Sequence, residues 1–182
     1  MTQPKSQFVR KGRHEQWRIA HTSQHRPFLK RLMFWGCFSN YGLGKLLVIQ
    51  GTLNGIKYKT TIEQALVPQI EEWFPEGQVI FQHDNAPCHK CALVRQYLET
   101  CNFEVMVWPP YSPDLNPIEN LWAILKQRVH KTSSSNIHEL ENKLKTIWET
   151  DPAVKASCTS LIESMPRRVE ACIAAKGGPL KY

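Results

Sequence analysis

Two carboxylates stand beside turn-forming residues, where a merely solvated charge would be unexpected. Asp84 lies in FQHDNAPCH, residues 81–89, and Glu119 lies in SPDLNPIENLW, residues 112–122. Carboxylates at a strand end and on a later helix would supply the hard oxygen ligands that Mg²⁺ prefers. Two such ions, about 3.5–4 Å apart, can hold the attacking and leaving oxygens of a phosphoryl transfer. Such a site generally uses three or more carboxylates.

Each carboxylate also has a purely structural interpretation. Asp84 precedes Asn-Ala-Pro, and Asp is favoured in turns and at helix N-caps. Glu119 follows Asn116 and Pro117, which places it at the third helical position, where a capping-box Glu belongs. The helical period of about 100° per residue also puts Glu119 beside Trp122, at the edge of the apolar stripe. Taken singly, each residue is better explained structurally, and both interpretations stay open.

The elements that would position these residues follow from periodicity and turn signals. Apolar runs predict strands, and repeats at helical spacing predict helices. Asn54 or Thr52 is a cap candidate for the first helix, and Pro68 predicts a kink in it. The expected strands are 31–39, 45–50, 79–84 and 103–108, and the expected helices are 55–74, 85–100, 117–129, 136–149 and 153–175, the last interrupted at Pro166. This order predicts an α/β fold, a mixed sheet flanked by helices, with sites at the carboxyl ends of strands.

Composition favours one globular domain. The chain has 182 residues, of which 42% are hydrophobic and 21% are charged. No apolar run approaches the roughly eighteen residues that cross a bilayer, and no signal peptide is recognisable, so we expect neither a membrane nor a secreted protein. The six cysteines are expected to be free thiols. Cys88 and Cys91 form a C-x2-C near His83 and His89, which permits a zinc site or a helix start with buried thiols.

Positive charge is concentrated at the start of the chain. Residues 1–31 hold eight Lys or Arg against one acid, Glu15, a net charge of +7, while the remaining residues balance to zero. Such an arm favours a polyanionic partner, with a solvated leader as the alternative. The candidate DNA-binding residues are Arg10, Lys11, Arg13, Arg18, Lys30 and Arg31. Arg167 and Arg168 are better explained as a solvated pair than as phosphate ligands.

A family resemblance joins these observations. HDNAPCH followed by WPPYSPDLNPIENLWAILK resembles the catalytic core of Tc/mariner-type DDE transposases, and MFWGCFS, GTLNG and ESMPRRVEACIAAKGG are similar to the same family. The resemblance covers residues 31–178. It implies a ribonuclease-H-like catalytic domain over residues 31–182, after a basic leader, residues 1–30, in which FVRK is compatible with part of a hairpin.

The resemblance also implies a chemistry and a setting. The family hydrolyses phosphodiester bonds at transposon ends and transfers the freed 3′ strand, with two Mg²⁺ or Mn²⁺. The implied partner is double-stranded DNA, a homodimer is compatible with the family, and the expected location is the nucleus, or cytoplasm and nucleus. On the same basis, Asp84 matches the second catalytic Asp, and Glu119 the third acid.

The sequence departs from the family pattern at the first catalytic Asp. The aspartates are Asp84, Asp114 and Asp151, so that none precedes Asp84. We therefore expect the fold to lack its first central strand, to leave neighbouring strands with open edges, and to be catalytically impaired. No recognition-helix pattern is present either. Whether the chain is an enzyme thus stays open, and the alternative is a non-catalytic remnant that binds nucleic acid nonspecifically.

Overall fold

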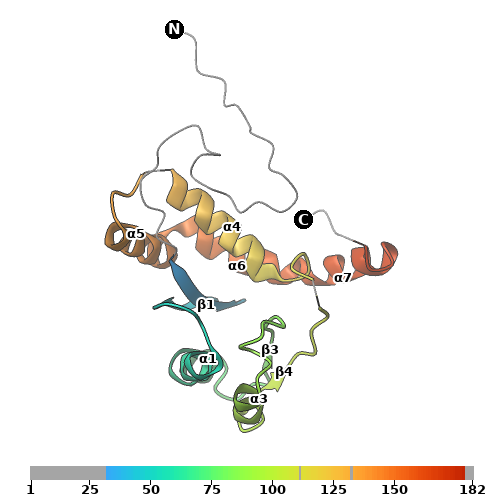
Figure 1. The fold of residues 1–182 in the computed structure, drawn as a ribbon. Helices are drawn as coiled ribbons and strands as arrows, with labels where there is room; N and C mark the ends of the chain where they lie inside the picture. Colours follow the sequence, from blue (N-terminus) through green and yellow to red (C-terminus); the bar gives the residue numbers. More distant parts are fainter. Residues whose placement is uncertain (1–31, 111, 132, 179–182) are drawn as a thin grey trace, which may run out of the picture. The chain divides into compact units, whose positions relative to one another are not determined.

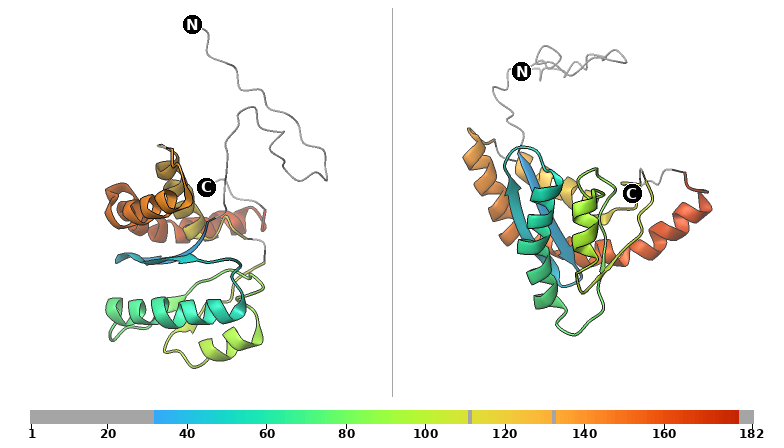
Figure 2. Two further views of the ribbon diagram at one scale, coloured as in Figure 1. Left: turned by 60° about the vertical axis from the view of Figure 1, so that its left-hand side comes forward. Right: turned by 60° about the horizontal axis from the view of Figure 1, so that its bottom comes forward.

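Four strands lie between two layers of helices in the computed structural model (Figures 1 and 2). The structure describes residues 32–110, 112–131 and 133–178. One apolar cluster, centred on Tyr58, Ile62 and Val94, packs the first helices against the strands. A second cluster, centred on Leu121, Leu125 and Trp148, packs the later helices against the opposite face. The six candidate DNA-binding residues, Arg10 to Arg31, lie outside the described residues.

A long antiparallel hairpin forms one part of the middle layer, as predicted. β1, Met33–Ser39, pairs with β2, Gly42–Ile49. The connection is tight because Gly42 adopts φ +124°, a conformation that costs glycine little. Gly36 is required for a different reason, namely lack of space, because a Cβ there would lie 2.9 Å from the Trp122 ring. A side chain at this position would push the helical layer away from the strand.

The predicted helix 55–74 is continuous but changes geometry near its centre. It comprises α1, Gly55–Thr61, the π-helical segment η2, Ile62–Leu66, and α2, Val67–Trp73. Asn54 caps it, because its side chain accepts a hydrogen bond from the Lys57 backbone at 2.9 Å. Pro68 has no N–H to donate, and the π turn precedes it. The Gln64 carbonyl accepts instead from Lys45 Nζ at 3.4 Å.

The second pair of strands is parallel and shorter than predicted. β3, Ile80–Phe81, pairs with β4, Glu104–Val105, in place of the predicted ranges 79–84 and 103–108. The predicted helix 85–100 also begins later, because α3 spans Ala92–Leu98. The Ala86 backbone donates to the Asp84 side chain, and residues 87–89 form a turn. Local hydrogen bonding by Asp therefore replaces the first helical turn.

The remaining helices follow the predicted periodicity closely. They are α4, Pro117–His130, α5, Ile137–Thr150, α6, Pro152–Glu163, and α7, Met165–Ala174. α6 and α7 divide the predicted helix 153–175 just before Pro166, as expected for proline in a first turn. The indole of Trp148 on α5 donates to the Gly44 carbonyl at 2.8 Å, which fastens this layer to β2.

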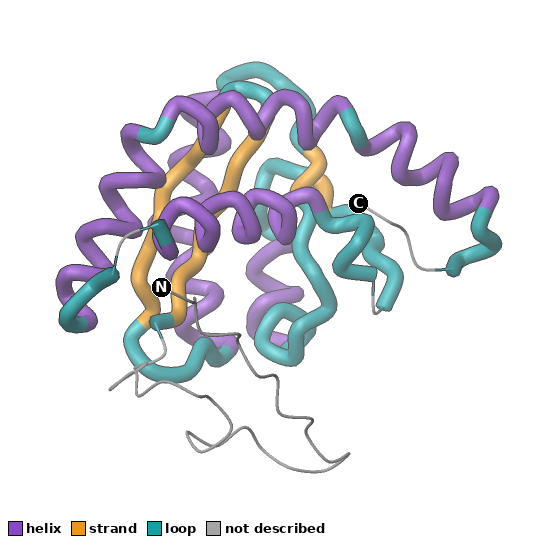
Figure 3. Tube along the Cα trace, turned by 90° about the horizontal axis from the view of Figure 1, so that it is seen from above, coloured by secondary structure: helices purple, strands orange, loops and turns teal. Residues whose placement is uncertain are grey.

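The two strand pairs do not join into one sheet within the part of the chain that the structure describes. β1 pairs only with β2, and β3 pairs only with β4, so that the facing edges of β1 and β3 are unpaired there (Figure 3). This is the arrangement expected of a mixed sheet that lacks a central strand. None of the described helices is long and apolar enough to span a membrane.

Candidate active site

The facing edges of β1 and β3 border a cleft of about 560 Å³. Residues 34–40 form one wall and residues 78–84 the other, and the start of α4 closes one side. Asp84 and Glu119 both line this cleft, although they come from different elements. The strand end and the helix start thus bring the two predicted acids to one cavity.

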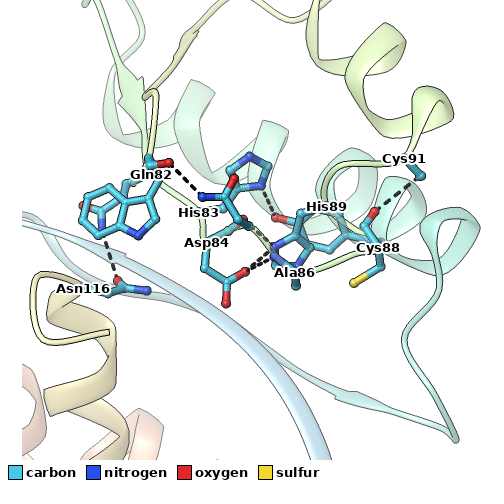
Figure 4. Close-up of polar contacts among 11 residues, drawn as sticks. Gln82, His83, Asp84, Ala86, Cys88, His89, Cys91 and Asn116 are labelled. Atoms are coloured by element: carbon cyan, nitrogen blue, oxygen red, sulfur yellow. Dashed lines mark hydrogen bonds and ion pairs between the residues drawn. The ribbon is translucent and has the colours of Figure 1, made fainter. Parts of the chain in front are cut away.

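Asp84 is held by its own turn (Figure 4). Its Oδ1 accepts from the Ala86 backbone N–H at 3.0 Å and lies 2.7 Å from Nδ1 of His89. The side chain of Asp84 is 52% exposed, so the carboxylate stays accessible from solvent. The structural interpretation of Asp84 as a turn residue is therefore correct, and it is compatible with a second role, because both contacts use the same oxygen.

Two histidines and a buried tyrosine stack behind Asp84. The ring of His89 lies 3.9 Å from the Tyr58 ring and 5.1 Å from the His83 ring, centroid to centroid. The Tyr58 hydroxyl and Nδ1 of His83 are 2.9 Å apart. Burial, followed by repulsion from His89, lowers the pKa of His83 to about 4, against a smaller opposing effect of Asp84. Burial also raises the pKa of Tyr58.

Glu119 occupies the third position of α4, as predicted, and is exposed. Asn116 is the N-cap residue, but its side chain does not cap the helix. Its Oδ1 instead accepts from Gln82 Nε2 at 3.1 Å, so the capping-box expectation is wrong for the side chain of Asn116. This hydrogen bond joins the segment before Glu119 to the segment before Asp84 (Figure 4).

One residue near the site contradicts its sequence interpretation. Arg168 on α7 is 3% exposed and is not half of a solvated pair, whereas Arg167 is exposed. Its guanidinium donates to the Asp114 carbonyl at 3.0 Å and to Asn120 Oδ1 at 2.7 Å. Ser164, four residues earlier, is also buried, and its hydroxyl accepts a hydrogen bond from Arg168 Nε at 2.8 Å. Adjacent arginines on a helix necessarily face different directions.

The donor set suits a hard divalent cation but is small. Asp84 and Glu119 offer carboxylate oxygens, as Mg²⁺ and Mn²⁺ require. Across residues 32–110, 112–131 and 133–178, no three His, Cys, Asp or Glu side chains gather closely enough to hold a metal ion. The zinc interpretation therefore fails for the C-x2-C motif as described. In that motif the Cys91 thiol donates to the Cys88 carbonyl, and Nδ1 of His89 contacts the Asp84 carboxylate.

Comparison with known families gives a consistent result. Residues 1–141 match the family model of the DDE superfamily endonucleases. The chain is 36% identical over 151 residues to the Tcb1 transposase of Caenorhabditis briggsae and, over the same length, to the Tc1 transposase of Caenorhabditis elegans. Each match covers 83% of this chain and 54% of the relative, so the chain spans about half the length of these curated relatives.

Solved structures share the fold. The catalytic domain of Mos1 transposase, in a structure with raltegravir and Mn, superposes with a TM-score of 0.76 at 26% identity, covering 86% of this chain and 80% of that one. The Mos1 mariner paired-end complex with Mn gives a TM-score of 0.75 at 26% identity, covering 96% and 54%. The α/β, ribonuclease-H-like prediction is thereby confirmed.

Proposed function

Since the chain belongs to the DDE superfamily endonucleases, among the Tc1/mariner transposases, we propose that it carries part of the machinery of DNA transposition. The observation that carries the proposal is the convergence of Asp84 and Glu119 on one cleft. The substrate is double-stranded DNA at transposon ends, and the chemistry is phosphodiester cleavage followed by strand transfer. The corresponding site of action in a eukaryotic cell is the nucleus.

Asp84 and Glu119 are the residues that would hold Mg²⁺ or Mn²⁺. A bound divalent ion supplies Lewis-acid stabilisation of the charge that develops on phosphate oxygens. The chain's own contribution is to present carboxylate oxygens at an accessible edge. The contacts of Ala86 and His89 fix the orientation of the Asp84 carboxylate, and the first turn of α4 fixes where Glu119 begins. Positioning of this kind governs a large share of catalytic rate.

We further propose that this chain is catalytically impaired when tested by itself. Two carboxylates leave a metal pair without a third ligand group to fix the spacing. Within the described residues, the edges of β1 and β3 that face each other are unpaired, and a strand that brings another carboxylate would fit between them. Cleavage should therefore appear only when such a strand is supplied.

A nicking assay tests this proposal. The purified chain is incubated with supercoiled plasmid and Mn²⁺ beside the variants Asp84→Asn and Glu119→Gln, and conversion to the open circle is quantified on gels. We expect the unextended chain to nick the plasmid no faster than the two variants do. When an apolar strand ending in Asp is fused before residue 1, we expect nicking that is lost in either Asp84→Asn or Glu119→Gln. Strong nicking by the unextended chain, abolished in Asp84→Asn, would contradict the impairment.

The charge distribution supports a second candidate function. Residues 1–31 carry a net charge of +7, which favours nonspecific binding of DNA through phosphate contacts. Affinity for a random duplex is measured between low and moderate salt for the full chain and for a variant that lacks residues 1–31. The remnant hypothesis requires that the deletion weakens binding and flattens its salt dependence; an unchanged slope would exclude it.

Self-association belongs to the same proposal. A catalytic unit that acts on two transposon ends would work as a homodimer, and one of the similar structures is a Mos1 transposase paired-end complex with the left transposon end. Sedimentation of the chain with and without a duplex would measure this. A monomer under both conditions would remove the dimer from the proposal.

A further inference from the structure

Arg168 is the most deeply buried cation among the residues that the structure describes. Only 3% of its surface is exposed, although arginine is almost never fully buried without partners. Nε donates to Ser164 Oγ at 2.8 Å, while Nη1 donates to Asn120 Oδ1 at 2.7 Å and to the Asp114 carbonyl at 3.0 Å. The guanidinium thus connects three separate places in the fold: the start of α7, the first turn of α4 and the loop before α4.

The two distant acceptors bracket Glu119. Asn120 follows it directly, and Asp114 lies five residues before it, in the loop that leads into α4. Pro113 lies in this loop and Pro117 is the first residue of α4, so the loop has few conformations once one of its carbonyls is fixed. The same cation holds the Asp114 carbonyl and the side-chain oxygen of Asn120. It therefore sets both where α4 begins and how the first turn of α4 is rotated.

We propose that Arg168 is a positioning residue for Glu119, an inference that rests on the proposed metal-binding role of that carboxylate. The side chain of Glu119 makes no hydrogen bond or ion pair with the other described residues, whereas its backbone N–H donates to the Asn116 carbonyl at 3.1 Å, so the place of the carboxylate depends on the backbone that carries it. Arg168 lies 48 residues beyond Asn120 along the chain and reaches this turn from α7. The hydrogen bond between Gln82, the residue after β3, and Asn116 holds the same turn.

The chemistry of the guanidinium explains why this position is an arginine. The planar guanidinium presents several N–H donors in fixed directions. Two of its nitrogens, Nε and Nη1, donate to three acceptors that lie in different segments of the chain. A lysine ammonium at the end of a flexible stem cannot reproduce that arrangement. A buried cation also enforces its contacts, because leaving it unpaired is costly. The exposed neighbour, Arg167, provides a control of equal charge.

Amide hydrogen exchange followed by mass spectrometry tests the positioning directly, without any activity. The variants are Arg168→Lys, Asn120→Ala, which removes only the acceptor and keeps a helix-forming residue, and the control Arg167→Lys. We expect exchange over residues 112–121 to accelerate about tenfold in the first two variants, because the hydrogen bonds that oppose local opening are lost. Residues 55–73 and 137–150 should exchange as in the parent, and the control should match the parent throughout.

Two results would overturn the proposal. One is unchanged exchange over residues 112–121 in both Arg168→Lys and Asn120→Ala. The other is acceleration spread evenly over all helices in both variants, which would make Arg168 a general stabilising residue with no special relation to Glu119.

Binding of Mn²⁺, measured by the loss of the free-ion electron paramagnetic resonance signal, separates this inference from the proposed function. Outer contacts of metal ligands typically affect metal affinity about 10- to 100-fold, and we expect Arg168→Lys to weaken binding at the lower end of that range. Arg167→Lys should not weaken it. If Glu119→Gln leaves binding unchanged, the proposed function fails at Glu119, whereas the exchange experiment still decides whether Arg168 holds the turn.

Discussion

The two acids of the cleft are held in opposite ways. The carboxylate of Asp84 is contacted directly, by the backbone of Ala86 and the ring of His89, both within five residues along the chain. Glu119 is positioned through its backbone, by Arg168 and by the hydrogen bond between Gln82 and Asn116, which bridges 34 positions. One acid is therefore oriented by a local turn and the other by the place where a helix starts.

This contrast explains how the two segments depend on the rest of the fold. A local turn can form wherever its short sequence is intact, because Asp favours side-chain hydrogen bonds to the nearby backbone. A helix start that is tied to β3 and α7 exists only when both of those elements are in place. The Asp84 turn does contact one residue that is distant in the sequence, Tyr58, whose ring stacks against His89. The predictions below ask how far each acid depends on distant contacts.

The largest effect is expected when Tyr58 is replaced by Ala. Tyr58 is 1% exposed and contacts both histidines behind Asp84, so its truncation leaves a cavity in the first apolar cluster. We expect the free energy of unfolding to fall by about 3–5 kcal/mol, as for other buried aromatic truncations. Urea denaturation followed by tryptophan fluorescence measures the loss.

The variant Tyr58→Phe is the matched control. It keeps the ring and removes only the hydroxyl that lies 2.9 Å from His83, with an expected cost of about 1–2 kcal/mol. If Tyr58→Ala were no more destabilising than Tyr58→Phe, the stacked ring would contribute little to stability, and the Asp84 turn would not depend on Tyr58.

A smaller effect is expected from breaking the link between the two acid segments. In Gln82→Met, the Oδ1 of the buried Asn116 loses its donor, which should cost about 1–3 kcal/mol. The double variant with Asn116→Leu removes both polar groups, and its loss should be smaller than the sum of the single losses by about 0.5–3 kcal/mol. Additive losses in a denaturation cycle would show that this hydrogen bond does not couple the two segments.

The half-buried His83 predicts a pH dependence of stability that concerns only the segment around Asp84. Its pKa is about 4 in the folded chain, against an ordinary value of 6.5. Between these values the unfolded state binds more protons, so stability is full above pH 6.5 and falls as the pH drops toward 4. With allowance for partial exposure, the loss is about 1–2 kcal/mol.

The measurement is urea denaturation of the metal-free chain at several pH values. The variant His83→Phe should lose less stability between pH 6.5 and 4 than the parent does. Equal slopes in the two proteins would mean that His83 is charged in the fold at no cost. Other groups would then account for the acid sensitivity.

The same contrast separates what the sequence predicted from what it could not. The hairpin, α1 with its Asn54 cap and the helices from α4 onward were predictable, because periodicity and capping are local signals. The unpaired edges of β1 and β3 among the described residues were also predictable, because the resemblance led us to expect a sheet without its first central strand. Asp84 and Glu119 were named from short motifs, and their meeting on one cleft depended on strand and helix order.

The failures involve competition between local and distant partners. The helix after Asp84 begins late because the Asp84 side chain takes the Ala86 N–H that a helix start would have left to solvent. The Asn116 side chain bonds Gln82 instead of capping α4, and no local pattern announces a partner 34 residues away. Arg168 looked solvated because its acceptors, Asp114 and Asn120, lie about fifty residues earlier. Sequence patterns therefore located the acids but not the contacts that orient Glu119.

The smallest effect is expected at His89, and it tests the local side of the contrast most directly. His89→Phe keeps a ring against Tyr58 and removes the contact with Asp84. Because the Asp84 side chain is 52% exposed, this contact should be worth only about 0–1 kcal/mol. Asp84 would still accept from the Ala86 backbone. Denaturation of this variant beside Asp84→Asn gives the value, and a loss above about 2 kcal/mol would exceed what an exposed pair supplies. The orientation of Asp84 would then rest on a ring packed against α1, and both acids would depend on distant elements of the fold.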